Sequence, residues 1–237
     1  MRFSLRLRAL ALALIGCGLT ARSQDPNAAY PRNYSIALET DEVTVMRVHY
    51  APHEKLGVHD HSKNPTVYVY LNDAGPVQFQ HFEEHAFALT RPPTNKGAFR
   101  SSPGRLEAHT VENLGDQSSD FLRVELKQVP LNKFTQSFRG AAPRSLSHSG
   151  TTVEFKNPFV EVQRIICAAP ACPAEKAGNP SVLVAFTSAR FTLQGKQEKQ
   201  LEPGTTLSLS RSDAFTIAPL GDSVAHLLRI VVPRAGK

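Results

Sequence analysis

The chain has 237 residues, enough for one large β domain or for two of about 100 residues each. It has no tryptophan, 17 prolines and 14 glycines, and its short β-branched runs favour an all-β plan over long helices. The formal net charge is +6, but four of the arginines stand within the first 22 residues. The sequence contains no run of Lys and Arg of the kind that is typical of nucleic-acid binding. We therefore expect no nucleic-acid partner.

The first 23 residues have the features of an export signal. Three arginines precede the apolar stretch 9–16, which is too short to span a bilayer but fits a signal-peptide core. Two processing sites stay open: residues 14–17 match a lipobox that ends in Cys17, and residues 21–23 form an ordinary small-x-small site. We expect an exported protein, periplasmic or extracellular, with a lipid anchor at Cys17 as one alternative and no transmembrane segment after processing.

Removal of residues 1–23 changes the charge balance. It leaves 23 Lys and Arg against 21 Asp and Glu, a net charge of +2. The basic character of the whole chain therefore comes mostly from the leader.

Short strands dominate the rest of the first half. Residues 24–34 are polar and contain proline, which is typical of a flexible lead-in. Turn clusters such as residues 72–75 and 101–104 then separate segments that alternate or run apolar over strand lengths. The predicted strands are residues 43–48, 66–71, 77–79 and 121–126. This spacing predicts a β-sandwich or a β-barrel.

Two histidines stand just before one of these strands, in the order His59-Asp60-His61. Side chains two apart on an extended strand point to the same face, so both imidazoles can aim at one point. Neutral imidazole suits zinc, copper, iron or nickel, and His109 from a distant strand would complete a set of three ligands with open positions. The sequence therefore predicts a metal site at His59, His61 and His109.

The same order of segments recurs in the second half of the chain. The matched segments are 43–48 with 160–165, 64–69 with 179–184, and 114–125 with 220–231. The offsets shrink along the chain, as expected for two copies of one domain with different loop lengths. A polar stretch near 134–150 separates the copies, so we predict domains at 24–140 and 141–237.

The repeat also predicts which chemistry the second copy lacks. The alignment places His59 on Ala174, His61 on Lys176 and His109 on Phe215. A protonated lysine has no lone pair for a metal, and a phenylalanine would fill the space that a metal needs. The candidate site therefore belongs to the first copy alone.

Two cysteines follow the leader, Cys167 and Cys172, with four residues between them. Export implies an oxidising compartment, in which two cysteines this close are more often bridged than bound to metal. We predict a disulfide between them rather than a catalytic thiol.

The segment 57–61 with its following strand, together with Pro103-Gly104 and the pair His109 and Asn113, resembles the two conserved motifs of the cupin superfamily. Cupins are double-stranded β-helix jelly rolls. Their first motif carries H-x-H and a glutamate, and their second carries a histidine followed by an asparagine. The resemblance implies two tandem cupin barrels, a bicupin whose second domain is degenerate.

The chain departs from the cupin pattern at the glutamate, where it has Pro65 and Thr66. The resemblance therefore implies a three-histidine set with Thr66 in the glutamate position. Some cupins without this carboxylate hold iron with three histidines and act as dioxygenases, and others have lost the metal. Loss of the carboxylate leaves the ion with its full charge, which weakens binding. The metal stays open among iron, manganese, zinc, copper and nickel.

The interior of a small barrel is either filled by side chains or left to hold one small ligand. We expect the pocket in the first barrel, with Thr66, Tyr68 and Tyr70 as candidate pocket residues. Phe79 and Phe99 are further candidates, for which core packing is an equally good use.

The segment 81–85 spells H-x-x-E-H, an inverted zinc-protease pattern when it lies on a helix. The prolines that follow cannot sustain a helix, so we interpret the segment as a solvated turn.

Three interpretations of function remain. The chain is an exported protein that binds a divalent metal and a small molecule, a three-histidine oxygenase-like enzyme for a small oxygen-rich substrate, or a metal-free envelope interaction module. No side chain stands out as a general acid or base, so no catalytic residue is assigned and binding is slightly favoured. The second barrel is expected to be a structural copy or to form a homodimer.

Overall fold

The computed structural model describes residues 25–82, 85–130, 133–168, 170–195, 197–221 and 223–233. These residues form antiparallel strands and one short helix, α1 (Pro26–Ala29). No helix within the described ranges has the length and apolar character needed to span a bilayer. The predicted leader with Cys17 lies outside the described residues.

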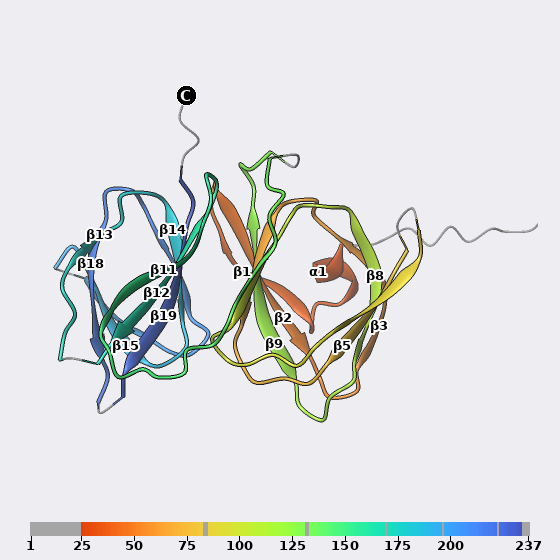
Figure 1. The fold of residues 1–237 in the computed structure, drawn as a ribbon, viewed down its shortest axis with the longest axis horizontal. Helices are drawn as coiled ribbons and strands as arrows, with labels where there is room; N and C mark the ends of the chain where they lie inside the picture. Colours follow the sequence, from red (N-terminus) through yellow and green to blue (C-terminus); the bar gives the residue numbers. More distant parts are fainter. Residues whose placement is uncertain are drawn as a thin grey trace, which may run out of the picture.

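Two sheets form the first barrel (Figure 1). In spatial order, the larger sheet contains β1 (Tyr34–Glu39), β2 (Val43–Tyr50), β9 (Ser119–Leu126), β4 (Thr66–Tyr70), β7 (Phe99–Ser102) and β10 (Phe138–Gly140). The smaller sheet contains β3 (Lys55–His61), β8 (Glu107–Asn113), β5 (Val77–His81) and β6 (Phe87–Arg91).

Two further sheets form the second barrel. The larger one contains β11 (Gly150–Lys156), β12 (Glu161–Cys167), β19 (Ala225–Val231), β14 (Ser181–Ala185) and β17 (Thr206–Leu209). The smaller one contains β13 (Glu175–Lys176), β18 (Ala214–Pro219), β15 (Ala189–Leu193) and β16 (Gln197–Leu201). The prediction of an all-β chain with two tandem jelly-roll barrels is confirmed.

Because side chains alternate along a strand, the two faces of each central strand lie in different surroundings. On β9, Leu122 and Val124 face a core between the barrels, whereas Phe121 and Arg123 face the interior of the first barrel. Because both faces of β9 are covered, almost every residue of the strand is buried. The interior of the first barrel can therefore be polar without loss of the apolar surface that joins the two barrels.

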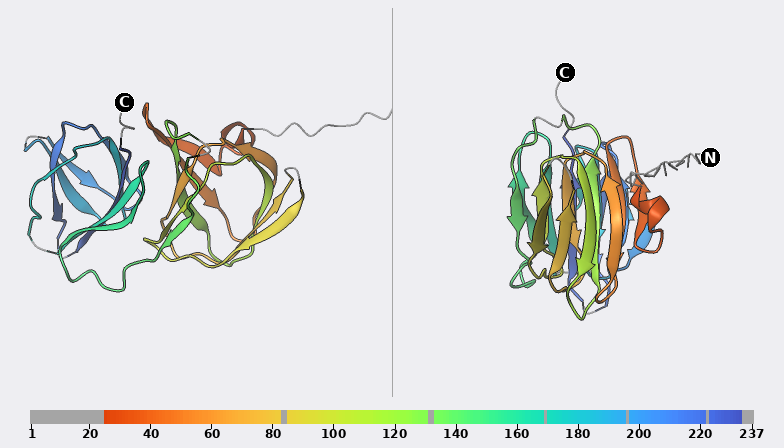
Figure 2. Two further views of the ribbon diagram at one scale, coloured as in Figure 1. Left: turned by 45° about the horizontal axis from the view of Figure 1, so that its top comes forward. Right: turned by 90° about the vertical axis from the view of Figure 1, so that its right-hand side faces the viewer.

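The core between the barrels is built from the large sheets of both. It contains Val43, Val45, Val67, Val69, Leu122, Val124 and Leu126 from the first barrel and Phe155, Val160, Val162, Val182, Val184, Leu228 and Ile230 from the second. Figure 2 shows the two barrels side by side, with these sheets facing each other. The barrels are thus joined by a continuous apolar layer as well as by the chain.

The interiors of the two barrels differ in chemistry although their strands pair in the same way. His81 lies opposite His109 in the first barrel, and Leu193 lies opposite Phe215 in the second. The same comparison of registers matches Tyr68 with Leu183, Arg91 with Leu201 and Arg100 with Leu207. The second interior is therefore filled with apolar side chains where the first carries polar ones.

The register corrects one part of the repeat alignment. Glu175 lies opposite Phe215, as His59 lies opposite His109, so Glu175 rather than Ala174 matches His59. Ala177, two residues further on, then matches His61 in place of Lys176. The alignment was one residue out because four residues, 62–65, separate His61 from β4, whereas only three, 178–180, separate Ala177 from β14. Phe215 remains the match of His109.

Three smaller expectations have different outcomes. The lead-in expected to be flexible contains α1, which Asp25 caps by accepting from the Asn27 amide at 2.8 Å. Cys167 and Cys172 are joined by a disulfide, with Cα atoms 5.7 Å apart. The boundary between residues 140 and 141 falls between β10 and β11 and stays a prediction.

The core between the barrels predicts a strong effect of truncation at Leu122, which is fully buried. Leu122→Ala should lower the free energy of unfolding by about 2–5 kcal/mol, because it removes apolar contacts and leaves a cavity. Val153→Ala on β11, where the side chain is 49% exposed, is the control and should cost less than about 1 kcal/mol. Urea unfolding followed by circular dichroism measures both, and equal losses would contradict the assignment of this core.

Candidate metal centre

The two histidines of the H-x-H sequence lie on β3 and face the interior of the first barrel. On β8, His109 is the cross-strand partner of His59, and Glu107 is the partner of His61. Directly opposed residues in an antiparallel pair have side chains about 5 Å apart on the same face. The pairing of β3 with β8 therefore brings the three histidines together.

The three imidazoles form a compact, buried group. The ring centroids are 5.0 Å apart for His59 and His61, 4.8 Å for His59 and His109, and 5.1 Å for His61 and His109. One ring nitrogen from each lies within 4.8 Å of the others, and all three residues are buried. With metal–nitrogen bonds of about 2.1 Å, this spacing fits a metal site.

Hydrogen bonds fix the orientation of the His59 ring. Its Nδ1 lies 3.0 Å from the Gly57 carbonyl oxygen, so Nδ1 donates and Nε2 carries the lone pair. Nε2 accepts from the Tyr34 hydroxyl at 2.7 Å. A Cβ atom on Gly57 would lie 2.6 Å from the Tyr30 hydroxyl oxygen, so a larger residue there would displace the Tyr30 side chain. The backbone thus presents the nitrogen that can bind a metal.

The other two histidines have ring nitrogens whose hydrogen-bonding capacity is unused. Among the described residues, His61 Nδ1 and both ring nitrogens of His109 are buried without a hydrogen-bond partner. A buried polar atom without a partner costs about 1–3 kcal/mol. A metal ion accepts these lone pairs, so the donor set fits a metal better than it fits a packed core.

The site keeps its histidines neutral. Burial is the largest cause that lowers the pKa of each: His59 below its usual range, His61 well below it and His109 to about 3. Neutral imidazole is the form that binds metals. At neutral pH no proton therefore has to leave before an ion binds.

A buried ion-pair network lies beside the histidines. Arg123 Nη1 donates to Glu107 Oε2 at 3.1 Å and to the Tyr68 hydroxyl at 3.1 Å, and its Nε lies 3.4 Å from Glu125 Oε1. Burial alone would raise the pKa of Glu107, but chiefly the charge of Arg123 lowers it to about 2. Glu107 is therefore ionised and already paired, which makes it a weak proton acceptor.

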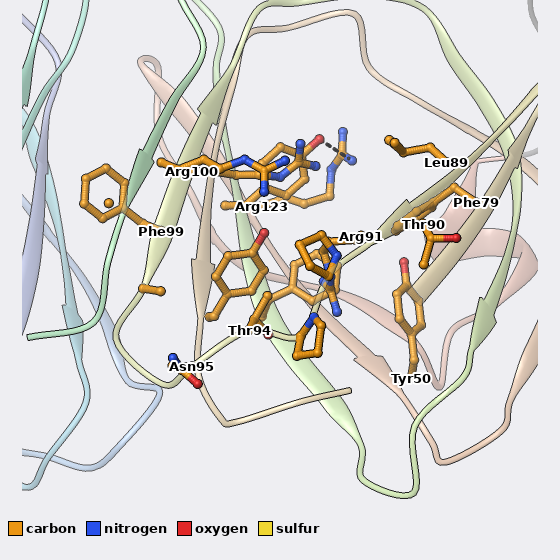
Figure 3. Close-up of a pocket in the computed structure, with 18 of the residues that line it drawn as sticks. Tyr50, Phe79, Leu89, Thr90, Arg91, Thr94, Asn95, Phe99, Arg100 and Arg123 are labelled. Carbon is orange, nitrogen blue, oxygen red and sulfur yellow. Dashed lines mark hydrogen bonds between the residues drawn. The ribbon is translucent and has the colours of Figure 1, made fainter. Parts of the chain in front are cut away.

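A cavity of about 450 Å³ opens beside this group, and His61 and His109 line it. Figure 3 shows Arg100 and Phe99 on one side of the cavity, Phe79, Leu89 and Thr90 on the other, and Arg91 between them. Arg139 and Gly140 of β10 also line it, as do Ala141, Ala142 and Arg144 in the connection between the barrels. The volume is in the usual range for small-molecule sites.

The candidate pocket residues divide into two groups. Tyr68 and Tyr70 line the cavity, as do Phe79 and Phe99. Thr66 does not line the cavity, so its prediction as a pocket residue was wrong. Its side chain is buried and its hydroxyl donates to the Asn64 carbonyl oxygen at 3.0 Å, so it closes the turn before β4.

The sequence interpretation missed His81, which is buried at the end of β5 rather than in a solvated turn. Its ring lies 5.2 Å from that of His109 and stacks on Phe87 at 4.5 Å, and it lines the cavity. The alternation Val77, Phe79, His81 points these side chains inward and was the available signal. Tyr34 and Glu107 were also missed, because only strand pairing brings them to the histidines.

Comparison with known proteins gives a fold but no family. No protein-family model matches the chain, and no curated protein does. Among solved structures, AerE from Microcystis aeruginosa superposes with a TM-score of 0.61 at 10% identity, over 85% of this chain and 98% of that one.

Two enzymes of known activity are also similar in structure. Bacillus subtilis oxalate decarboxylase, which has Mn(II) centres, gives a TM-score of 0.55 at 11% identity, over 85% of this chain and 75% of that one. A mutant of salicylate 1,2-dioxygenase from Pseudoaminobacter salicylatoxidans gives 0.53 at 10% identity, over 81% and 71%. These neighbours are cupins, and at this identity they show that the chain has the cupin fold.

The lowered pKa of His109 predicts acid sensitivity of the metal-free protein. Between pH 6.5 and about 3 the unfolded chain binds a proton at His109 that the folded chain does not. Stability therefore falls as the pH falls, by up to about 1.4 kcal/mol per pH unit from this group. His109→Phe, which copies Phe215 of the second barrel, should make the decline between pH 6 and pH 4 shallower.

Urea unfolding at a series of pH values checks this expectation. His148→Ala changes an exposed histidine and should leave the decline as it is in the unaltered protein. An unchanged decline in His109→Phe would show that the buried ring is protonated in the folded state.

Proposed function

We propose that the first barrel binds one divalent transition metal through His59, His61 and His109 and holds a small molecule in the adjoining cavity. The observation that carries the proposal is the group of buried imidazole nitrogens within 4.8 Å of one another. Among the described residues, three of the six ring nitrogens, His61 Nδ1 and both of His109, are buried without a hydrogen-bond partner. Cupin neighbours that are metalloproteins, such as the decarboxylase with Mn(II) centres, support it.

The donor set restricts the metal only to a class. Three neutral imidazoles without a carboxylate suit iron, manganese, zinc, copper or nickel, and they leave the full charge of the ion uncompensated. When bound, such an ion supplies Lewis acidity and open coordination positions for a ligand oxygen. The residues of this chain hold the ion, orient His59 through Gly57, and keep the site buried.

Tyr34 has a further part in this site. Its hydroxyl now donates to His59 Nε2 at 2.7 Å, the nitrogen whose lone pair a metal would take. The same hydroxyl lies 2.8 Å from that of Tyr50, so it keeps a partner when the bond to His59 ends. Tyr34 therefore stabilises the metal-free site without blocking it permanently.

The cavity supports small-molecule binding rather than a purely structural metal. A structural metal site is usually closed by protein ligands, whereas a site that takes a ligand keeps open positions. Here His61 and His109 line a cavity of about 450 Å³. Turnover of an oxygen-rich substrate remains the alternative. Buried His81, whose ring lies 5.2 Å from that of His109, is the observation that favours it.

Export stays part of the proposal on the evidence of the leader. The disulfide between Cys167 and Cys172 supports an oxidising compartment. The choice between a free periplasmic or secreted protein and a lipid anchor at Cys17 remains open, and homodimer formation stays a prediction.

Loss of two ligands should abolish metal binding. For the double variant His59→Ala, His61→Ala we expect less than about a tenth of an equivalent of metal, because one imidazole cannot replace three. The unaltered protein, expressed without a polyhistidine tag in metal-supplemented medium, should carry about one equivalent. Elemental analysis measures both and names the metal.

His109→Phe and His85→Ala complete this experiment. His109→Phe should lose the metal and stay folded, because Phe215 occupies the same register in the second barrel. His85→Ala changes an exposed histidine and should retain the metal. Unchanged metal content in the double variant would place the metal elsewhere and would refute the proposal.

A further inference from the structure

The cavity of the first barrel carries a large excess of positive charge. Its lining contains Arg91, Arg100, Arg105, Arg123, Arg139 and Arg144, and the acidic residue among the lining residues is Glu107. Glu107 is engaged by Arg123 at 3.1 Å and by Arg105 at 3.4 Å. A cavity of this composition concentrates negative ligands.

Arg123 does not account for this excess. Its charge is balanced by Glu107 and by Glu125, and strand register matches it with Arg229, which is buried in the second barrel as well. An arginine that recurs in the apolar barrel belongs to the architecture of the fold.

Arg91 and Arg100 are different. Arg91 is 7% exposed, donates from Nη2 to the Ser119 hydroxyl at 2.7 Å and lies 5.2 Å from the Tyr70 ring centre. The Arg100 guanidinium lies 3.9 Å above the Tyr68 ring. In both residues Nε is buried without a hydrogen-bond partner, and neither guanidinium pairs with a carboxylate within the described part of the chain.

The second barrel shows that the fold does not require these charges. Leu201 and Leu207 occupy the positions of Arg91 and Arg100, and both pack with the apolar interior. Burial lowers the pKa of Arg91 below its usual range, which reflects the cost of keeping a cation there. A bound anion would offset that cost.

We propose that Arg91 and Arg100 bind the carboxylate of a small aromatic acid, whose ring lies against the aromatic walls of the cavity. The guanidinium fork matches a carboxylate, and a buried charge-assisted pair is strong. Phe79, Phe121 and Tyr70 supply flat apolar surface in the same cavity. The inference deepens the proposed function and rests on it for the placement of this ligand beside His61 and His109.

Binding of benzoate to the metal-free protein tests the inference by isothermal titration calorimetry. Benzoate should bind with a stoichiometry of one, whereas neutral benzamide, of nearly the same shape, should bind at least about tenfold more weakly. Inorganic phosphate should also bind more weakly than benzoate, because it has no ring to bury. Equal binding of benzoate and benzamide, tighter binding of phosphate, or no binding of benzoate would overturn the proposal.

Arg91→Leu and Arg100→Leu copy the second barrel and should each weaken benzoate binding about tenfold or more. Arg190→Leu changes an arginine of the second barrel that is half exposed and paired with Glu198, and it should bind benzoate as the unaltered protein does. Circular dichroism confirms that each variant is folded. Wild-type affinity in both cavity variants would refute the assignment.

The same titrations separate this inference from the metal site. The double variant His59→Ala, His61→Ala should lose the metal and still bind benzoate, and Arg91→Leu should still take up about one equivalent of metal. If the protein binds benzoate through these arginines but takes up no metal, the metal proposal alone fails. If it takes up metal but not benzoate, the inference alone fails.

Discussion

The buried ion pair of Arg123 with Glu107 is the interaction on which the first barrel depends. It joins β9 of the large sheet to β8 of the small one, with the two atoms 3.1 Å apart, and Tyr68 adds β4 to the same network. Removal of one partner of such a pair leaves an uncompensated buried charge, which costs several kcal/mol. Glu107 and His109 lie two residues apart on β8 and therefore on the same face, so the pair with Arg123 holds the face of β8 that carries His109 toward the interior. A barrel with a polar interior is stable here because its charges are paired and because the outer faces of β2, β4 and β9 form an apolar core with the second barrel.

The second barrel serves as a natural control for the first. Apart from β10, it has the same strand order and matching registers in the central strands. It keeps the buried arginine as Arg229, which lies 3.8 Å from Glu175. At the positions of the candidate ligands and of the unpaired arginines it carries apolar residues, apart from Glu175. Because one chain contains both kinds of interior, the polar residues that only the first interior carries are not required by the fold. Residues that both interiors share are explained by stability, and the polar residues found only in the first interior are best explained by function.

The sequence predicted the fold and the three histidines but only part of the cavity. Alternation within single strands was sufficient to place His59 and His61 on one face, and a repeated order of segments was sufficient to indicate two barrels. Strand pairing was not visible, so Tyr34, Glu107, Arg91 and Arg100 had no signal that linked them to the histidines. His81 was misplaced because the H-x-x-E-H segment was interpreted as a solvated turn once a helix was excluded, although Val77 and Phe79 already gave its period-two direction. The repeat alignment slipped by one residue at His59, because it was anchored on the Asn-Pro pairs before β4 and β14, and the loop that precedes β14 is one residue shorter than the loop that precedes β4.

The charges of the site link its two proposed ligands. Three neutral imidazoles give a divalent ion no negative charge, and Arg91 and Arg100 add positive charge to the cavity that His61 and His109 line. The arginines oppose cation binding, because like charges repel strongly where water is scarce, and neutral imidazoles do not offset that repulsion with negative charge. An anion at the arginines removes much of that opposition, and a metal at the histidines in turn attracts the anion. By linkage the two effects are equal in size. A barrel with the cupin fold but without a carboxylate ligand can therefore obtain negative charge from its bound anion, so that the ion is held most tightly when the cavity is filled.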